Sequence, residues 1–414
     1  MTEKNGRSSS GSTALQKPET LAVHAGIEID PATNAIAPNV SMSVNNVLVP
    51  GDGAFSADGV EDLAELPFLY ARWSNPTVRQ LEKRMAALEA TDEAIASATG
   101  LAAIAGVFFT FLKAGDHLIV SDVCYAGAAE LARRILPDYG IDVTAVNMSR
   151  ITDVEAAIRP NTRLIHCESP CNPIMRMTDL DQVANLAHRH GILVSVDSTF
   201  ATPAATQPAR LGVDLVIHSL TKFINGHGDA LGGVVCGSKA LIAKIRGRAG
   251  VYLGAALAAH NAWLIMRGID TLFARMRMAS DTAQRVATFL ENHPAVERVI
   301  YPGLASHPQR ALADRQMALS GGMIAFRLRG DMHDAARVMA RELKTIHYAF
   351  SLGHQRSIIV HLDTAEMNAT FQLDGTQLED YRAFAGDGIF RLSIGLEAAE
   401  DLIADLGQAL RTPA

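Results

Sequence analysis

The sequence lacks the features that mark several classes of protein. No apolar run approaches the roughly 20 residues that a membrane-spanning helix requires. The first residues are polar and contain no apolar core of a secretory signal, so we expect a disordered tail over residues 1–20. The net charge of -7 provides no basic surface for nucleic acid. These absences exclude a membrane-spanning protein and argue against a nucleic-acid partner.

Cysteine is also scarce, because the 414 residues contain only 4 cysteines at irregular spacing, which excludes a disulfide framework. Cys167 and Cys171 have no second pair of ligands at zinc-site spacing, so we predict buried reduced thiols and no metal site. We expect the chain to work in the cytoplasm. The composition is otherwise ordinary for an α/β protein of two or three domains.

A lysine follows a short apolar run in the stretch from Val213 to Cys236. The run has the length of one buried strand and is followed by Ser219, Thr221 and Lys222. Open α/β sheets bind their ligands at such strand ends. A lysine in a desolvated site has a lowered pKa and can form a Schiff base, while hydroxyls beside it suit a phosphate. A surface lysine after a strand is the alternative interpretation of this stretch alone.

Other strand ends carry residues of the same kind. Asp197 ends an apolar strand, where a carboxylate is costly without a partner, and Lys222 follows one crossover later. We therefore expect these two side chains in one crevice. Gly100 opens an apolar helix after a short strand, and its N–H group can bind an anion. Tyr125 also follows a strand and either stacks on a planar ligand or lies at the rim of the core.

The remaining segments suggest an arm and two domains. Residues 21–70 are rich in Pro, Gly and Asn and are interpreted as an extended arm that lies on another surface, and residues 71–268 as the larger domain. A helical pattern runs from Ala255 to Leu290, with a domain boundary near Gly268. Residues 269–414 are expected to form a smaller α/β domain with an antiparallel sheet. Its expected strands are Gly322–Leu328, Thr345–Leu352, Ser357–Leu362 and Ile389–Ile394.

Taken together, these residues match what pyridoxal phosphate needs from a protein. The cofactor uses a lysine that forms a Schiff base and a carboxylate that pairs with its ring nitrogen. Arg391, inside a strand pattern, is suited to clamp a carboxylate or to form a structural ion pair. We interpret the chain as an enzyme that depends on this cofactor. A cofactor-binding relic or an interaction protein is the non-enzymatic alternative, and joint retention of Lys222, Tyr125, Asp197 and Arg391 argues against it.

From about Thr20 to its C-terminus the chain resembles the Cys/Met-metabolism family of pyridoxal phosphate enzymes. The family includes cystathionine γ-synthases, cystathionine and methionine lyases, and homoserine-ester sulfhydrylases. The motifs that carry the resemblance are Tyr70-x-Arg72-x-x-Asn75-Pro76-Thr77, Thr99-Gly100-Leu101, Tyr125, Glu168-x-Pro170-x-Asn172-Pro173, Asp197-Ser198-Thr199, Ser219-x-Thr221-Lys222 with Gly226-His227, and Arg391-Leu392-Ser393-x-Gly395.

The resemblance implies a fold and a set of roles. The fold is the aspartate-aminotransferase type (fold type I), with a large, mainly parallel sheet in the cofactor-binding domain and a smaller C-terminal α/β domain. Lys222 bonds the cofactor and shuttles protons, and Asp197 pairs with the ring nitrogen. The family also implies a homotetramer whose sites are built by dimers. The other implied roles are phosphate binding by Gly100, Leu101, Ser219 and Thr221, and by Tyr70 and Arg72 of a neighbouring subunit; stacking and acid–base chemistry by Tyr125; contact with the phenolic oxygen by Asn172; and binding of the substrate carboxylate by Ser351 and Arg391.

The substrate end departs from the family pattern. Phe350 stands where γ-enzymes that handle cystathionine commonly have glutamate, which favours a methionine γ-lyase releasing a thiol, ammonia and 2-oxobutanoate. Gly127 differs from the cysteine of those lyases. The alternatives are γ-replacement on an O-acylhomoserine, by a cystathionine γ-synthase or a sulfhydrylase, and a cystathionine β- or γ-lyase. The segment Gly353-His354-Gln355-Arg356 replaces the usual Gly-Gly-x-Glu, and the sequence assigns no purpose to its added positive charge.

Overall fold

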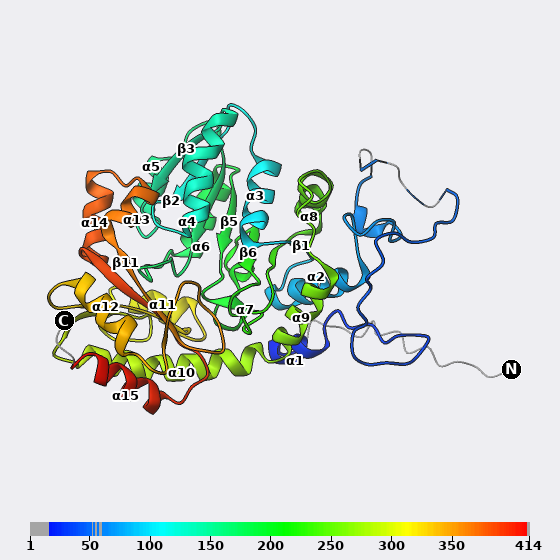
Figure 1. The fold of residues 1–414 in the computed structure, drawn as a ribbon. Helices are drawn as coiled ribbons and strands as arrows, with labels where there is room; N and C mark the ends of the chain where they lie inside the picture. The colour runs from blue at the N-terminus through cyan, green and yellow to red at the C-terminus, as the bar shows by residue number, and fades with distance from the viewer. Residues whose placement is uncertain (1–15, 52, 54–55, 58–59, 412–414) are drawn as a thin grey trace.

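Two β-sheets organise the chain, as the computed structural model shows (Figure 1). The structure describes residues 16–51, 53, 56–57 and 60–411. The larger sheet has 7 strands in the order β1-β7-β6-β5-β4-β2-β3, and the smaller has 5 in the order β10-β11-β12-β9-β8. One hydrophobic core surrounds the larger sheet, and a second lies between the smaller sheet and its helices.

The larger sheet is mainly parallel, as predicted. Its strands β2 to β6 pair in parallel, whereas β7 runs antiparallel to both β1 and β6. Near-continuous apolar runs are typical of parallel strands that are covered on both faces, and β2 is buried along its whole length. The strands are β1 Glu93–Ser97, β2 His117–Ser121, β3 Asp142–Val146, β4 Thr162–Glu168, β5 Leu193–Asp197, β6 Leu215–Ser219 and β7 Gly233–Gly237.

The smaller sheet is antiparallel except for the parallel pair of β10 with β11. Its strands are β8 Val296–Ile300, β9 Met323–Leu328, β10 His347–Tyr348, β11 Ile358–Asp363 and β12 Gly388–Ser393. The expected strand Thr345–Leu352 is therefore much shorter in the structure. Ser351 and Gly353 have φ values of 87° and 74°, and this left-handed backbone turns the chain away from the sheet.

The helices surround both sheets, and α10 contacts both halves of the chain along the lower edge of Figure 1. The pattern from Ala255 to Leu290 forms two helices instead of one, because the backbone leaves the helical region at Thr271 (φ −111°, ψ 5°). The helices are α1 Pro18–His24, α2 Pro76–Glu89, α3 Gly100–Phe111, α4 Ala126–Glu130, α5 Ile151–Ala156, α6 Leu180–Arg189, α7 Thr202–Ala205, α8 Lys239–Ile245, α9 Ala259–Asp270, α10 Leu272–Glu291, α11 Arg310–Gln316, α12 Met332–Glu342, α13 Thr364–Phe371, α14 Gly375–Ala385 and α15 Ala399–Ala409.

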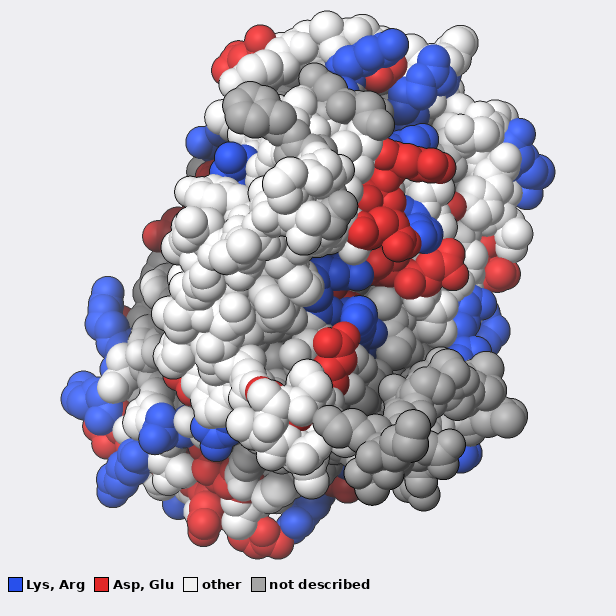
Figure 2. Space-filling view, turned by 90° about the vertical axis from the view of Figure 1, so that its right-hand side faces the viewer, with Lys and Arg blue, Asp and Glu red and all other residues white. Residues whose placement is uncertain are grey.

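The N-terminal segment begins with a helix and continues as an arm. Of the expected tail, residues 1–15 lie outside the described residues, and α1 already begins at Pro18, with Leu21 and Ala22 buried. The following segment has little regular structure and exposes many apolar side chains. Figure 2 views the molecule from the right-hand side of Figure 1 and shows that this face carries a broad uncharged area. Among the described residues of the arm, the most exposed apolar side chains are Ile29, Ile36, Met42, Val44, Val47 and Val49.

Several absences concern only the part of the chain that the structure describes. None of the helices there combines the length and the apolar character that a membrane span needs. No group of three or more His, Cys, Asp or Glu side chains is placed there to hold a metal ion. The four cysteines are free and buried, as the sequence predicted.

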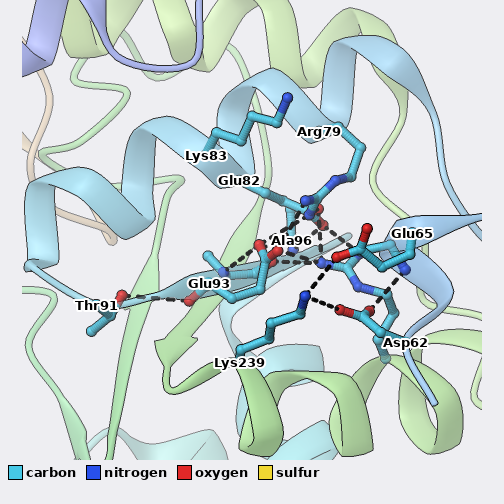
Figure 3. Close-up of polar contacts among 12 residues, drawn as sticks. Asp62, Glu65, Arg79, Glu82, Lys83, Thr91, Glu93, Ala96 and Lys239 are labelled. Carbon is cyan, nitrogen blue, oxygen red and sulfur yellow. Dashed lines mark hydrogen bonds and ion pairs between the residues drawn. The ribbon is translucent and has the colours of Figure 1, made fainter. Parts of the chain in front are cut away.

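A largely buried ionic cluster fixes α2 against β1 (Figure 3). Glu82 lies at its centre, with Oε2 2.5 Å from Arg79 Nη1 and 3.0 Å from Arg246 Nη2. The second glutamate, Glu93, binds Arg79 at 3.0 Å. Glu82 also accepts a hydrogen bond from the N–H of Ala96 in β1. The Glu82 carboxylate therefore accepts hydrogen bonds from two guanidinium groups and from one backbone N–H of a strand.

Replacing Glu82 with alanine is expected to destabilise the protein by about 3–5 kcal/mol, because it leaves two buried cations without their shared partner. Thermal and urea unfolding would measure the loss. Glu65→Ala is the matched control, since Glu65 forms an exposed pair with Lys239 and its removal should leave the melting temperature unchanged. Equal melting temperatures for the two variants would contradict the role of Glu82.

Candidate active site

A cavity of about 320 Å³ opens at the carboxyl ends of the parallel strands β2, β4, β5 and β6. This is the edge of the sheet where open α/β folds bind ligands. The predicted site residues that line it are Gly100, Leu101, Tyr125, Asn172, Asp197, Ser219, Thr221 and Lys222. The expectation that Asp197 and Lys222 share one crevice is met by this geometry.

Lys222 follows β6 and is largely withdrawn from solvent. Its Nζ donates a hydrogen bond of 2.8 Å to Ser351 Oγ, which comes from the C-terminal half of the chain. Burial lowers the pKa of the Lys222 amine, and the positive charge of Arg391 lowers it further, while Asp197 opposes both. This lysine therefore loses its proton more readily than an exposed one, which a nucleophilic or basic amine requires.

Asp197 ends β5 and is only 6% exposed. Its Oδ1 accepts a hydrogen bond of 2.9 Å from the N–H of Thr199. Burial raises the pKa of this carboxyl, whereas the hydrogen bonds of Thr199 and the charges of His218 and Lys222 lower it. Thr199 Oγ1 also accepts the N–H of Ser219 at 2.8 Å, so one threonine joins the ends of β5 and β6. The buried acid is suited to a cationic ligand group.

The first turn of α3 borders the same cavity. Thr99 caps the helix, and its Oγ1 accepts the N–H of Ala102 at 3.1 Å. Gly100 is required by close packing, because an added Cβ would lie 2.7 Å from the Cβ of Ser219. First-turn N–H groups have no partner within their own helix, and the positive end of the helix attracts anions. Gly100, Leu101 and the hydroxyl of Ser219 therefore form a group suited to a phosphate.

Glu168 is a residue of the site to which the sequence analysis assigned no role. It ends β4 beside Asp197 in the register, and its two carboxylate oxygens accept the N–H groups of Tyr125 at 2.6 Å and Asn172 at 2.8 Å. Burial raises its pKa, and the negative charge of Asp197 raises it further. Glu168 thus holds two cavity residues in place. Its position at the end of a strand, in the motif Glu168-x-Pro170-x-Asn172-Pro173, is the feature of the sequence that could have identified it.

Arg391 connects the C-terminal half to the cavity from strand β12. Its Nη1 donates to Asn172 Oδ1 at 2.9 Å, and its Nη2 donates to the carbonyl of Ser351 at 3.0 Å. Burial lowers the pKa of this guanidinium to about 10, so it is still cationic at neutral pH. The negative charge of Glu168 acts on Arg391, but the hydrogen bonds of its guanidinium go to the uncharged groups of Asn172 and Ser351. The guanidinium can therefore still pair with a carboxylate ligand.

Three predicted residues lie away from the cavity of their own chain. Tyr70 is about half exposed beside the arm, and Arg72 donates a hydrogen bond of 2.6 Å to the carbonyl of Val251. Phe350 is 77% exposed on the loop that carries Ser351. A single chain therefore does not bring these side chains to the other site residues.

The donor set of the cavity fits pyridoxal phosphate. Lys222 offers an amine with a lowered pKa, and Asp197 is a buried acid without a full counter-ion, which a protonated ring nitrogen would supply. The first turn of α3, together with Ser219 and Thr221, would hold the phosphate, and Tyr125 would lie against the ring. A metal-based alternative has no comparable set of ligands in the described chain.

The comparisons with known proteins agree with this fit. The chain is 44% identical to a canavanine gamma-lyase of Pseudomonas canavaninivorans (94% of this chain, 95% of the relative) and 40% identical to an L-methionine gamma-lyase of Pseudomonas deceptionensis (95% and 97%). The crystal structure of cystathionine gamma-lyase from Lactobacillus plantarum complexed with L-serine superposes with a TM-score of 0.84 at 34% identity (95% and 98%). Residues 19–411 match a family of Cys/Met metabolism PLP-dependent enzymes, and the chain belongs to that family.

Proposed function

We propose that this pyridoxal phosphate enzyme catalyses γ-elimination on an L-amino acid that carries a leaving group on its γ carbon. The presence of Lys222 and Asp197 in one cavity supports the proposal most directly. L-Methionine is the first candidate substrate, and with water it would give methanethiol, ammonia and 2-oxobutanoate. When bound, the cofactor supplies an aldehyde for the amino groups and a conjugated ring that stabilises negative charge next to the substrate nitrogen.

Lys222 and Asp197 would have different roles in the reaction. Lys222 would hold the cofactor and, once the substrate amine takes its place, move the protons of the α and β carbons. Its lowered pKa supports this role, because an amine acts as a base only after it has lost its own proton. Asp197 would keep the ring nitrogen protonated through a buried charge pair. The Thr199 hydrogen bond orients its carboxylate.

Tyr125 is suited to deliver a proton to the departing group. Burial raises the pKa of its phenol, and the charge of Asp197 raises it further, so the hydroxyl stays protonated at neutral pH. A thiolate that leaves the γ carbon needs a proton donor of this kind. Glu168 holds the backbone N–H of Tyr125 and so would fix the ring over the cavity.

The other residues would select the substrate. Arg391 and Ser351 would bind the α-carboxylate, since they join the C-terminal half to the cavity. The apolar members of the cavity wall suit an uncharged thioether better than a charged group. The apolar wall residues are Leu101, Ile104, Phe200, Leu231 and Leu352.

L-Canavanine is a second candidate substrate, because the canavanine gamma-lyase relative has 44% identity with this chain. Its γ carbon bears a guanidinooxy group, whose departure would release hydroxyguanidine. The structural argument against it is the apolar wall, which offers no acidic partner beyond Glu168 and Asp197 at the strand ends. γ-Replacement on an O-acylhomoserine is the third candidate, since it shares the early proton transfers.

Product analysis distinguishes these candidates. The purified holoenzyme is incubated separately with L-methionine, L-canavanine, L-cystathionine and O-acetyl-L-homoserine, and 2-oxobutanoate and free thiol are measured. We expect both products from methionine in equal amounts. Added cysteine should leave this yield unchanged in an eliminating enzyme and divert it in a replacing one. No 2-oxobutanoate from methionine, with turnover of another substrate, would overturn the methionine assignment.

We also propose a dimer-built site within a homotetramer. The exposed apolar side chains of the arm need a covering surface, and a second copy of the chain would supply it. Tyr70 and Arg72 lie outside the cavity of their own chain and would contact the cofactor phosphate in the partner's site. The four buried free thiols support work in a reducing compartment such as the cytoplasm.

A further inference from the structure

The loop of residues 350–357 lies directly on the loop that carries Lys222. Gly353 is the point of closest approach, because an added Cβ would lie 2.5 Å from the backbone nitrogen of Phe223 and 2.9 Å from the carbonyl carbon of Lys222. The N–H of Gly353 is held by Ser393 Oγ at 2.8 Å. The position of this loop relative to the lysine is therefore fixed by backbone packing.

This packing brings the side chains of Ser351 and His354 close to the amine of Lys222. Ser351 Oγ accepts the hydrogen bond of Lys222 Nζ at 2.8 Å and lies 3.4 Å from His354 Nε2. Ser351 has φ 87°, an unfavourable conformation for a residue other than glycine, and such strain persists only where the surroundings impose it. On the other side of the imidazole, an added Cβ at Gly228 would lie 2.9 Å from His354 Nδ1, so the ring is confined between the two loops.

The groups around His354 are cationic. The positive charges of Lys222 and Arg356, one on each loop, act on it, and Arg275 of α10 lines the same small cavity. Arg275 donates to the carbonyls of Phe223, Ile224 and Gly268 and so supplies charge without a bond to the imidazole. Burial lowers the pKa of His354, and the charges of Lys222 and Arg356 lower it further. The ring is therefore neutral at neutral pH and its Nε2 can accept a hydrogen bond.

We propose that His354 is a positioning residue for Lys222, which acts through the hydroxyl of Ser351. The inference rests on the proposed role of Lys222. Neutral His354 accepts the hydroxyl hydrogen of Ser351 at its Nε2, so the lone pairs of Ser351 Oγ face Lys222 Nζ and accept the hydrogen bond of the lysine amine. A protonated His354 cannot accept the hydroxyl hydrogen, and Ser351 then no longer holds the amine. The reacting amine is thus kept in a fixed position by two consecutive hydrogen bonds.

The proposal predicts a specific pH dependence. The form in which both Lys222 and His354 are neutral reacts fastest, so below the pKa of His354 its protonation slows the reaction in addition to the protonation of Lys222. That pKa lies below the ordinary histidine value of about 6.5. His354→Gln keeps a neutral acceptor that does not titrate, whereas His354→Ala removes the acceptor.

The test measures how fast Lys222 bonds pyridoxal phosphate in the cofactor-free enzyme between pH 5 and 9. The adduct is trapped with borohydride and quantified on the Lys222 peptide by mass spectrometry. At pH 8 we expect His354→Gln to match the wild-type rate, and His354→Ala to be slower by about 3- to 10-fold, the equivalent of one hydrogen bond. Below the pKa of His354, the ratio of the wild-type rate to the His354→Gln rate should fall by about 3- to 10-fold and then level off, because protonation removes the same hydrogen-bond acceptor as His354→Ala.

Two features of the experiment ensure that a change in the rate ratio comes from His354. The ionisation of the cofactor phosphate is common to both proteins and cancels in the ratio. His190→Gln changes an exposed histidine at the opposite end of β5 and should reproduce the wild-type profile. In a Ser351→Ala background, His354→Gln should have no further effect. A constant ratio across the pH range would overturn the proposal, while absence of any adduct on Lys222 would instead refute the proposed role of the lysine.

Discussion

Lys222→Ala is expected to lower the turnover number by at least about 10³-fold, because the variant loses both the cofactor-bonding amine and the base of the proton transfers. Among the residues that the structure describes, Lys222 is the one lysine that combines a place in the cavity with a lowered pKa. Product formation from methionine measures the loss. Borohydride treatment should leave the variant without a covalent adduct, although the cofactor still binds through its phosphate.

Two comparisons sharpen this prediction. Lys244→Ala removes an exposed lysine of α8 and should retain wild-type activity. A small primary amine such as ethylamine should restore part of the activity of Lys222→Ala, because it can enter the space that the side chain vacates and accept the protons. Activity within tenfold of wild type without added amine would contradict the assignment of Lys222.

Asp197→Asn is expected to lower activity by about 10²-fold or more and at the same time to raise the melting temperature of the cofactor-free protein. The amide keeps the acceptor for the Thr199 N–H but cannot pair with a cationic ring nitrogen. In the cofactor-free protein the buried carboxylate has a raised pKa. The folded state therefore binds more protons than the unfolded state, and stability falls as the pH rises through that range.

The sign of the stability change follows from this linkage. At pH 8 the buried negative charge lowers the free energy of unfolding, and the asparagine removes that cost. The difference between variant and wild type should disappear as the pH falls below the ordinary aspartate pKa of about 3.9. Removal of the neighbouring charge should also lower the pKa of Glu168. Asp138→Asn, at an exposed position, is the control, and a lower melting temperature for cofactor-free Asp197→Asn would contradict the account.

Sequence patterns predicted much of the sheet because buried parallel strands are marked by continuous apolar runs. Such runs located β5 and β6 and, with them, the positions of Asp197 and Lys222 at neighbouring strand ends. The edge strands β3 and β8 have partly exposed, mixed sequences and gave no comparable signal. A helix break at Thr271 was also missed, because the apolar spacing continues across it.

The parts of the site that sequence could not predict depend on contacts between distant segments. Glu168 binds the N–H groups of two residues on separate turns, and only the register of β4 with β5 brings it beside Asp197. The contact of His354 with Ser351 depends on a left-handed backbone that a serine rarely adopts. The roles of Tyr70 and Arg72 require a second subunit and stay predictions.

The contact of Gly353 with the backbone of Lys222 and Phe223 has a consequence for protein engineering. Grafting the C-terminal half of a relative onto this chain to alter substrate choice would bring together two surfaces that leave no space for a methyl group. A functional hybrid would need residues 221–228 and 350–357 from the same parent. Libraries that recombine these segments freely should yield well-expressed proteins with poorly aligned lysines.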